Sequence, residues 1–391
     1  MSFGRSILPL WPLDPAATYL NHGTVGVVPC QVLEAQQRLR ERIERHPSRF
    51  MLRDLWTFAG AEQEEPTLMR QAAADVADFV GADAKDLVFV DNTTAGANAI
   101  LHSLPFSAGD EIIVSDHAYG GVAAAIRYAC ERSGAVVTQV TVPYPAFDPA
   151  STVARFVDAI SSRTRLVVVD HIAAESALIF PVEEIVRGCH DRGVPVLVDG
   201  AHVPGVLALD VSVVGADFYA ANLHKWAMAP RSSAFLVVAE PFQTTIHPVV
   251  ISWGLGTGFT QEFDWVGTRD PTPWLCAPDG IQFLNELGLE DLRRYNHDLA
   301  WQAAQYLTDR WRTPLEFDES SVGCMVSVMA PERFGSTKED AVRLRDRLLF
   351  EHNIEVHAHA RAGQVWLRVS VQAYNDADDI ERLADAVRRE G

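Results

Sequence analysis

The sequence predicts an α/β protein with a mainly parallel mixed sheet in a large domain and a small α+β domain at its C-terminal end. Between about Leu87 and Val238, short apolar runs alternate with amphipathic stretches, which is typical of βαβ units whose sheet is covered on both faces. After about Pro273 the pattern changes to a helix, two strand-like runs and a last helix. With 48% hydrophobic and 22% charged residues, the 391-residue chain has the composition of a globular protein with a sizeable core.

Seven short apolar runs are the predicted strands of the large domain. They are Leu87–Val90, Glu111–Ser115, Val136–Val140, Leu166–Asp170, Val196–Asp199, Asp217–Ala220 and Ala234–Val238. We expect most of them to be parallel and buried, because helices on both faces exclude water from such a sheet. Polar residues close several runs, among them Asp91, Ser115 and Asp199. Since open α/β sheets bind ligands beyond the carboxyl ends of their strands, we expect the site at this edge.

The small domain begins after residues 241–273, a stretch that is rich in Gly, Trp, Thr and Pro, has no period and separates the two domains. A helix is predicted from Lys338, and strand-like runs follow at 354–360 and 365–371. In the last helix, which Asn375 is placed to cap, four apolar residues recur at helical spacing: Ile380, Leu383, Ala384 and Val387. We expect residues 16–265 to form the large domain, and residues 1–15 and 266–391 to form the small domain with the N-terminal segment and linker.

The charge and cysteine content exclude several classes of function. The 52 acidic and 33 basic residues give a formal charge of −19, which repels nucleic acids and anionic membrane surfaces. The five cysteines are scattered and lack a C-x-x-C pair, which fits a reducing compartment. The first residues contain a short apolar stretch broken by prolines, so we expect neither a signal peptide nor a membrane span. We therefore expect a cytoplasmic protein without nucleic acid or membrane partners.

One stretch carries the residue types of a site for a carbonyl cofactor. Asp199 ends a predicted buried strand, His202 follows it, and Lys225 lies further along, next to bulky apolar groups. A lysine with apolar neighbours loses hydration, so its amine is more easily neutral and nucleophilic, as a Schiff base with an aldehyde requires. A strand-end carboxylate holds a pyridine nitrogen protonated and turns the ring into an electron sink. Together these residues point to pyridoxal phosphate; taken singly, Lys225 also fits a surface lysine and Asp199 a helix cap.

Two further strand ends supply the other parts of such a site. Thr93 and Thr94 open a helix directly after a strand, where free N–H groups and the helix dipole favour a phosphate. An ordinary threonine cap is the alternative for this pair. In the segment 115–121, Tyr119 is the candidate for stacking on the pyridine ring, and His117 is the second choice. The alternative for Tyr119 is a core tyrosine with a hydrogen-bonded hydroxyl.

A set of motifs from about Tyr19 to the C-terminus resembles one known family. In chain order the motifs are YLNHGTVGVVP, HPSRFMLRD, NTTAGANAIL, SDHAYGG, VDGAHVPG, LHKW, GTRDPTPW and LRVSVQAYN. The set is similar to the class V aminotransferase family of fold type I pyridoxal phosphate enzymes, and most similar to its isopenicillin N epimerase-like branch. It is specific for cofactor and fold, and much less specific for the reaction.

The resemblance implies how the cofactor is held. Lys225 would form the Schiff base, Asp199 would pair with the ring nitrogen, and His202 would approach the phenol oxygen. Tyr119 would stack over the ring. The phosphate would be held by four residues of the same chain: Thr93, Thr94, Asn222 and His224. Two residues would reach it from a second subunit: Gly267 and Thr268. A homodimer with a shared active site follows from the resemblance, and no metal is implied.

The resemblance also implies how the substrate is held. Arg368 would clamp the α-carboxylate, for which a planar bidentate group is suited. Asn21, His22 and Gly23 would line the entrance. One departure concerns residues 171–176, where Ala173 replaces a hydroxyl residue of relatives and cannot donate a side-chain hydrogen bond to the cofactor. Glu175 in the same run either faces a cationic substrate group or is simply solvated.

Three weaker signals favour structural interpretations. Residues 254–258 are rich in glycine but lack the spacing of a phosphate loop, so a flexible loop is expected. His357 and His359 share one face of a predicted strand, yet no third ligand is spaced nearby, and ordinary packing is expected instead of a metal site. Cys324 is expected in a buried strand, which argues against a persulfide-forming cysteine.

The predicted reaction starts when an amino acid or cysteine conjugate displaces Lys225, whose amine then removes the α-proton while the ring delocalises the carbanion. Reprotonation from the other face by Tyr119 or His117 would give epimerisation. Loss of a sulfur group from the β-carbon would give carbon–sulfur cleavage. We give this reaction the same rank as epimerisation, and either reaction places the enzyme in sulfur or secondary metabolism. Aminotransfer and decarboxylation-coupled deamination rank behind. A catalytically silent protein of this fold is disfavoured because Lys225, Asp199 and Arg368 all remain, and a nucleotide-dependent enzyme lacks the phosphate fingerprint.

Overall fold

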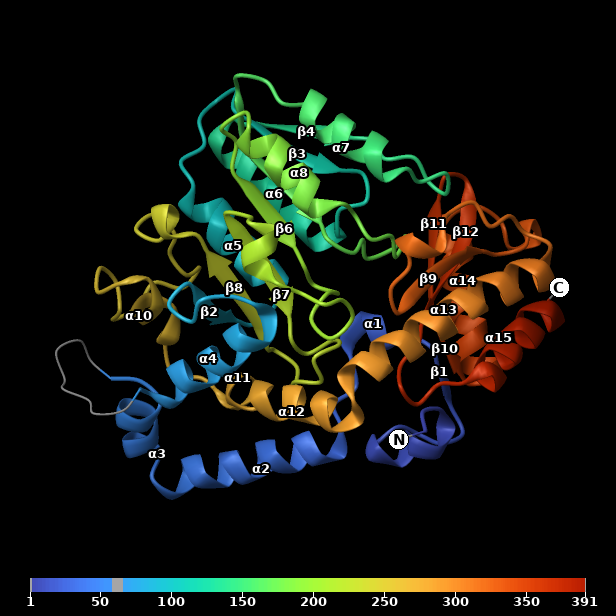
Figure 1. The fold of residues 1–391 in the computed structure, drawn as a ribbon, viewed down its shortest axis with the longest axis horizontal. Coiled ribbons are helices and arrows are strands. Elements are labelled where there is room, and N and C mark those ends of the chain that lie inside the picture. The colour runs from blue at the N-terminus through green and yellow to red at the C-terminus, as the bar shows by residue number, and fades with distance from the viewer. Residues whose placement is uncertain (1, 58–65, 391) are drawn as a thin grey trace.

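A seven-stranded sheet forms the centre of the larger part of the molecule (Figure 1). The computed structural model describes residues 2–57 and 66–390. In sheet order the strands are β2 (Leu87–Val90), β8 (Ala234–Val238), β7 (Phe218–Asn222), β6 (Val196–Asp199), β5 (Thr164–Asp170), β3 (Glu111–Ser115) and β4 (Val136–Val140). Every predicted strand of the large domain is thus present, with bounds shifted by at most two residues.

The sheet is mainly parallel, as predicted. The pairs β3–β4, β3–β5, β5–β6 and β6–β7 are parallel, and β8 runs antiparallel to both β7 and β2. Most strands are also buried, as expected, and β4 is the exception, with Val136 and Val137 exposed. The reason is that β4 is an edge strand, so helices do not cover it as they cover the central strands.

Helices cover both faces of the sheet and create two apolar cores. They are α4 (Leu68–Val80), α5 (Thr93–Ser103), α6 (Gly120–Ser133), α7 (Pro149–Asp158), α8 (Val182–His190) and α9 (Val211–Val214). Because side chains alternate along a strand, Ile112 packs in one core with residues of α5 and α6, whereas Ile113 packs in the other with residues of α4 and α8. This double cover explains why most strands are apolar along their whole length.

A second, three-stranded antiparallel sheet lies in the C-terminal part, drawn in orange and red in Figure 1. Its order is β11 (His357–Arg361), β12 (Gln364–Ser370) and β9 (Met325–Met329). The helices of this part are α13 (Leu289–Trp311), α14 (Lys338–His352) and α15 (Ala377–Arg389). The predicted cap of the last helix is wrong by one residue. Asp376 forms a capping box with Asp379, and Asn375 donates a hydrogen bond to the Asp379 carboxylate at 3.0 Å.

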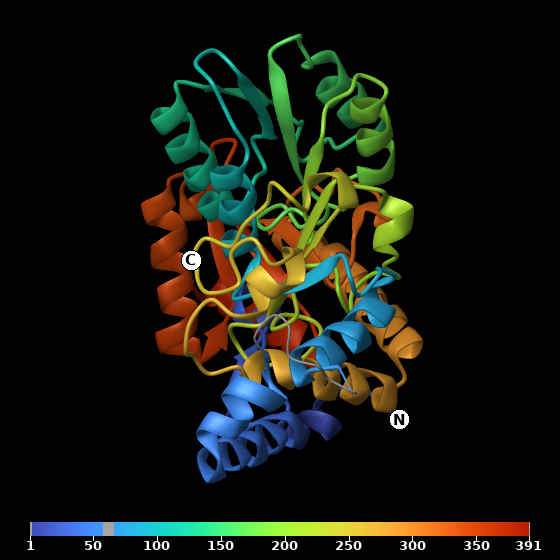
Figure 2. The same ribbon diagram turned by 90° about the vertical axis from the view of Figure 1, so that its left-hand side faces the viewer.

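The N-terminal segment joins the two parts. The short parallel pair of β1 (Thr18–Tyr19) and β10 (Ile354–Glu355) ties it to the C-terminal part. The helices α1 (His22–Val25), α2 (Cys30–Arg45) and α3 (Pro47–Arg49) follow, and α2 extends along the base of the molecule in both views (Figures 1 and 2). Short helical turns lie at Arg5–Leu10, Phe50–Asp54, Glu240–Phe242, Glu319–Ser321 and Glu332–Phe334.

The predicted link between the domains is partly helical. It contains α10 (Phe259–Asp264) and the start of α11 (Thr272–Leu275), after which α12 (Ala277–Leu287) follows. Both α11 and α12 pack against α2 and α4. The domain boundaries at residues 15 and 265 stay a prediction. Among the described helices, none is long and apolar enough to cross a membrane.

Candidate active site

A cavity of about 500 Å³ lies where the carboxyl ends of the large sheet face the small sheet. It brings together residues that the sequence predicted from distant segments: Gly23, Thr93, Thr94, Tyr119, Asp199, His202, Asn222, His224, Lys225 and Arg368. The strand register explains part of this assembly, since Asp170 and Asp199 are paired at the ends of β5 and β6, and Asp199 is paired with Ala220, two residues before the end of β7. The loops that follow these strands therefore meet at one place.

Other predicted site residues do not line this cavity. His22 is buried behind it, where its ring nitrogens lie 2.8 Å from the Tyr374 hydroxyl and from the Lys225 carbonyl oxygen. Asn21 accepts a hydrogen bond from Arg368 at 3.4 Å, so it supports the entrance without forming its wall. Thr268 lines a separate hollow beside α2, and Gly267 precedes it. The proposed contact of these two with a second subunit stays a prediction.

His117, the second choice for stacking, packs away from the cavity. Its ring nitrogens lie 2.7 Å from the Ser176 hydroxyl and 3.1 Å from the Val142 carbonyl oxygen. Its ring also contacts Tyr144 and Phe180 edge to face. Tyr119, by contrast, lines the cavity and is 47% exposed, so its ring is available to a ligand. The structure therefore favours Tyr119 over His117 for the stacking role.

Lys225 is buried at the centre of the site. Desolvation and the nearby Arg368 charge lower the pKa of its amine to about 7, although Asp199 and Asp170 oppose this shift. Its Nζ lies 3.1 Å from His202 Nε2. A lysine of this kind is largely neutral just above neutrality and is therefore a competent nucleophile and base.

The tautomer of His202 follows from its two contacts. Trp226 donates its indole N–H to His202 Nδ1 at 3.2 Å, so Nδ1 is an acceptor. Burial lowers the pKa of His202, which leaves the ring neutral. The one ring proton is then on Nε2, and the hydrogen bond at 3.1 Å runs from His202 to the neutral Lys225 amine. Trp226 thereby positions the proton that faces the cavity.

Two buried carboxyl groups lie at neighbouring strand ends in the floor of the cavity. Burial raises the pKa of Asp199, and burial together with the Asp199 charge raises the pKa of Asp170. Asp170 was not among the predicted site residues, although it ends a predicted strand as Asp199 does. Asp170 also accepts a hydrogen bond from the backbone N–H of Tyr119 at 3.3 Å. This contact fixes the start of α6 and with it the candidate stacking residue.

The N-terminus of α5 supplies a cradle for an anion. The backbone N–H of Thr93 donates to the Asn222 side-chain oxygen at 3.0 Å, which ties the helix to the end of β7. The hydroxyl oxygen of Thr93 is buried and has no hydrogen-bond partner among the residues the structure describes. Since buried hydroxyls are nearly always paired, this group fits a phosphate oxygen in the cavity.

Arg368, on β12 of the small sheet, is the residue predicted to bind the substrate carboxylate. Burial lowers the pKa of its guanidinium to about 10, a value at which the group stays charged near neutrality. It donates to the Ala174 carbonyl oxygen and, at 2.7 Å, to the Thr24 hydroxyl. Its buried Nε has no partner within the described chain. A fixed cation with a free donor fits a substrate carboxylate. The residues present therefore fit a phosphorylated pyridine aldehyde together with an amino acid.

The comparisons agree with this geometry. A family model described as aminotransferase class-V matches residues 27–383. The chain belongs to this family. Pyridoxal 5'-phosphate is therefore its cofactor, and the protein is a pyridoxal phosphate-dependent enzyme of fold type I.

Two curated relatives show how the family varies. The chain is 32% identical to a putative L-cysteine desulfhydrase of Oryza sativa subsp. japonica, over 96% of this chain and 85% of that protein. It is also 32% identical to the isopenicillin N epimerase of Streptomyces clavuligerus, over 96% of this chain and 95% of that protein. The fold resembles an apo cysteine desulfurase from Thermococcus onnurineus NA1, with a TM-score of 0.79 at 20% identity over 100% and 98% of the two chains.

The weaker sequence signals have different outcomes. His357, expected to be ordinary packing, lines the cavity and pairs in register with Arg368. Cys324 is buried directly before β9, and burial raises its pKa to about 12, so its thiol is unreactive. Ala173 is buried outside the cavity wall, which Ala174 and Glu175 form instead.

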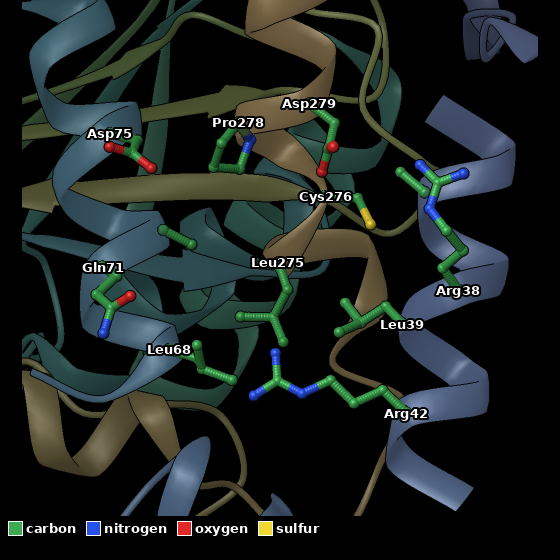
Figure 3. Close-up of a pocket in the computed structure, with 12 residues that line it drawn as sticks. Arg38, Leu39, Arg42, Leu68, Gln71, Asp75, Leu275, Cys276, Pro278 and Asp279 are labelled. Carbon is green, nitrogen blue, oxygen red and sulfur yellow. The ribbon is translucent and has the colours of Figure 1, made fainter. Parts of the chain in front are cut away.

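A second hollow of about 410 Å³ lies between α2, α4 and the helices α11 and α12 (Figure 3). Arg38, Leu39 and Arg42 extend from α2 toward Leu275 and Cys276, as Figure 3 shows. Burial and the neighbouring acidic groups raise the pKa of the Cys276 thiol to about 12. This thiol is therefore not a nucleophile near neutrality, and the hollow offers no chemistry comparable to that of the first cavity.

Proposed function

We propose that this protein is a carbon–sulfur β-lyase that acts on cysteine or on a cysteine conjugate. The observation that carries the proposal is the buried Lys225, whose amine has a pKa lowered to about 7, in one cavity with Asp199 and Arg368. The name of the desulfhydrase relative, at 32% identity over almost the whole chain, supports the same reaction class. We further propose that the enzyme acts in the cytoplasm, in sulfur or secondary metabolism, and takes no nucleic acid or membrane partner.

Each group has a defined task in this reaction. When bound, pyridoxal phosphate withdraws electrons from the α-carbon of the amino acid joined to it. Asp199 would keep the ring nitrogen protonated, and Thr93, Thr94, Asn222 and His224 would hold the phosphate. Arg368 would bind the α-carboxylate and so orient the Cα–H bond toward Lys225.

Lys225 then serves as both base and acid. Its neutral amine removes the α-proton, and the electron pair of that bond forms the double bond between Cα and Cβ. The Cβ–S bond breaks as this double bond forms, and the sulfur leaves with the electron pair as a thiolate. The thiolate then takes a proton from the Lys225 ammonium. Addition of water to the remaining three-carbon unit gives pyruvate and ammonia, so the products are a thiol, pyruvate and ammonia.

Epimerisation at the α-carbon is the second candidate. It requires one group that removes the α-proton and another that returns a proton on the other side. The cavity holds the phenol of Tyr119 in addition to Lys225, which is the specific observation in its favour. The epimerase relative, at 32% identity, supports this possibility.

Incubation of the holoenzyme in deuterated water with amino acids and cysteine conjugates separates the two candidates. A lyase releases pyruvate, ammonia and thiol, whereas an epimerase returns the amino acid with inverted configuration and deuterium at the α-carbon. Lys225→Ala is expected to lower turnover by at least ~10³-fold. Lys85→Ala is the matched control, because Lys85 is exposed and its amine contacts Asp83 at 3.2 Å, outside the cavity. Near-normal turnover in Lys225→Ala would refute the proposal.

A further inference from the structure

The small sheet places two residues beside the predicted carboxylate clamp that the proposed chemistry leaves unused. His357 on β11 is paired in register with Arg368 on β12, so both side chains lie on the same face and reach the cavity. Glu175 is exposed, also lines the cavity, and follows Ala174, whose carbonyl oxygen accepts a hydrogen bond from Arg368. The Glu175 carboxylate therefore lies at the cavity mouth, close to the Arg368 guanidinium.

The cavity wall offers few cations to a substrate side chain. Among the described residues that line it, Arg368 and Lys225 are the only lysine or arginine side chains. In the proposed function, Lys225 serves the cofactor and the α-proton, and Arg368 is occupied by the α-carboxylate. A second anionic group on the substrate would meet no further cation in this wall and would be repelled by Glu175.

His357 does not provide the missing positive charge. Burial and the neighbouring Arg368 charge lower the pKa of its ring to about 3, so it is neutral under ordinary conditions. The buried ring of His359 stacks beside it, with centroids 5.7 Å apart and planes inclined by 19°. Within residues 2–57 and 66–390 the His357 ring makes no hydrogen bond, so its N–H and ring nitrogen are free for a ligand.

We propose that the substrate is an amino acid with a single carboxylate whose side chain ends in a cationic group, which Glu175 pairs with and His357 contacts through its ring. This inference rests on the proposed function, because it takes Arg368 as the site of the α-carboxylate. It goes beyond that function by naming the substrate class. Glu175 and His357 are specificity residues, and neither takes part in breaking the Cβ–S bond.

The test compares three cysteine conjugates that differ in the charge of the terminal group: S-(2-aminoethyl)-, S-propyl- and S-(carboxymethyl)-L-cysteine. With the holoenzyme, kcat/KM is expected to be highest for the aminoethyl conjugate and at least ~10-fold higher than for the carboxymethyl conjugate. Glu175→Gln is expected to remove most of this ratio, and Glu175→Lys to invert it. Glu183→Gln, an exposed acid on α8 outside the cavity, is the matched control and is expected to leave the ratio unchanged.

A binding measurement keeps this inference separate from the reaction class. Titration calorimetry of the holoenzyme with L-lysine, L-norleucine and L-2-aminoadipate reports the same charge preference without a sulfur leaving group. L-lysine is expected to bind most tightly, and His357→Phe to weaken its binding more than that of L-norleucine. Equal affinity for L-lysine and L-2-aminoadipate, unchanged by Glu175→Lys, would overturn the inference. A clear preference for L-lysine without cleavage of any conjugate would instead count against the lyase and leave the charge selection supported.

Discussion

At the scale of single residues, the protonation of Lys225 controls how the apoprotein captures its cofactor. Only the neutral amine attacks an aldehyde, and its pKa of about 7 lies far below the ordinary lysine value of 10.5. We therefore expect the rate of pyridoxal phosphate capture to rise about tenfold per pH unit below pH 7 and to level off above it. Stopped-flow absorbance of the apoprotein mixed with the cofactor measures this profile.

Two variants test the physical cause of this shift. After desolvation, Arg368 lowers the pKa of Lys225, whereas Asp199 raises it. Arg368→Gln is therefore expected to move the midpoint of the capture profile upward, and Asp199→Asn to move it downward. A midpoint near 10 in the wild-type protein would show that the amine is not desolvated. A midpoint that is unchanged in both variants would show that these charges do not affect the pKa of Lys225.

Site residues that belong to distinctive sequence motifs could be predicted, whereas those outside such motifs could not. Lys225, Asp199 and Arg368 belong to distinctive motifs, and the cavity unites them. Asp170 was missed because a strand-ending aspartate by itself is a common cap, and only the pairing of β5 with β6 places it beside Asp199. His22 was assigned to the entrance, but its buried contacts with Tyr374 and the Lys225 carbonyl place it behind the site. A linear motif does not specify the direction of a side chain.

At the scale of elements, the start of α5 leaves the Thr93 hydroxyl buried and without a partner in the described structure. We therefore expect this hydroxyl to lower the stability of the apoprotein and to raise its affinity for the cofactor. Thr93→Val removes the hydroxyl and keeps the shape. Because an unpaired buried hydroxyl is unfavourable, the apoprotein is expected to be as stable as the wild type or more stable, by up to about 1 kcal/mol. The affinity for pyridoxal phosphate is expected to fall about tenfold, since the hydroxyl would donate to a charged phosphate.

Denaturant unfolding of the apoprotein and equilibrium titration with the cofactor measure the two effects. Thr152→Val is the matched control, because the Thr152 hydroxyl is buried and donates to the Asp148 carbonyl oxygen at 2.8 Å. That variant is expected to lose about 1 kcal/mol of unfolding free energy and to keep its cofactor affinity. Unchanged affinity in Thr93→Val would exclude the hydroxyl as a phosphate ligand.

Strands with strong patterns were predictable, whereas their environment was not. The seven apolar runs of the large sheet all form strands, because β-branched residues in short runs between turns strongly favour them. The exposure of Val136 and Val137 depends on the position of β4 at the sheet edge, which is a property of the strand order. The same holds for His357. Its strand was predicted, but its place beside Arg368 follows from the register of β11 with β12.

At the scale of the whole molecule, one exposed apolar surface is consistent with the predicted homodimer. Five exposed apolar side chains follow one another closely after β8: Val249, Val250, Ile251, Trp253 and Leu255. Soluble monomers rarely expose so continuous an apolar run, which is typical of an interaction surface. Thr268 is exposed and lies outside the cavity of its own chain. We therefore retain the prediction that Gly267 and Thr268 serve the phosphate site of a second copy.

Mixing two inactive variants tests this shared site. Lys225→Ala removes the base, and Thr268→Glu is expected to repel the phosphate in the neighbouring active site while the fold is kept, because Thr268 is exposed. In a mixed dimer, the Thr268→Glu subunit keeps its lysine and receives an intact Thr268 from its partner, so one of two sites is restored. Random pairing at equal amounts is then expected to recover about a quarter of the wild-type turnover. No recovery from purified mixed dimers, or a solution mass of a single 43.1 kDa chain, would refute the shared site.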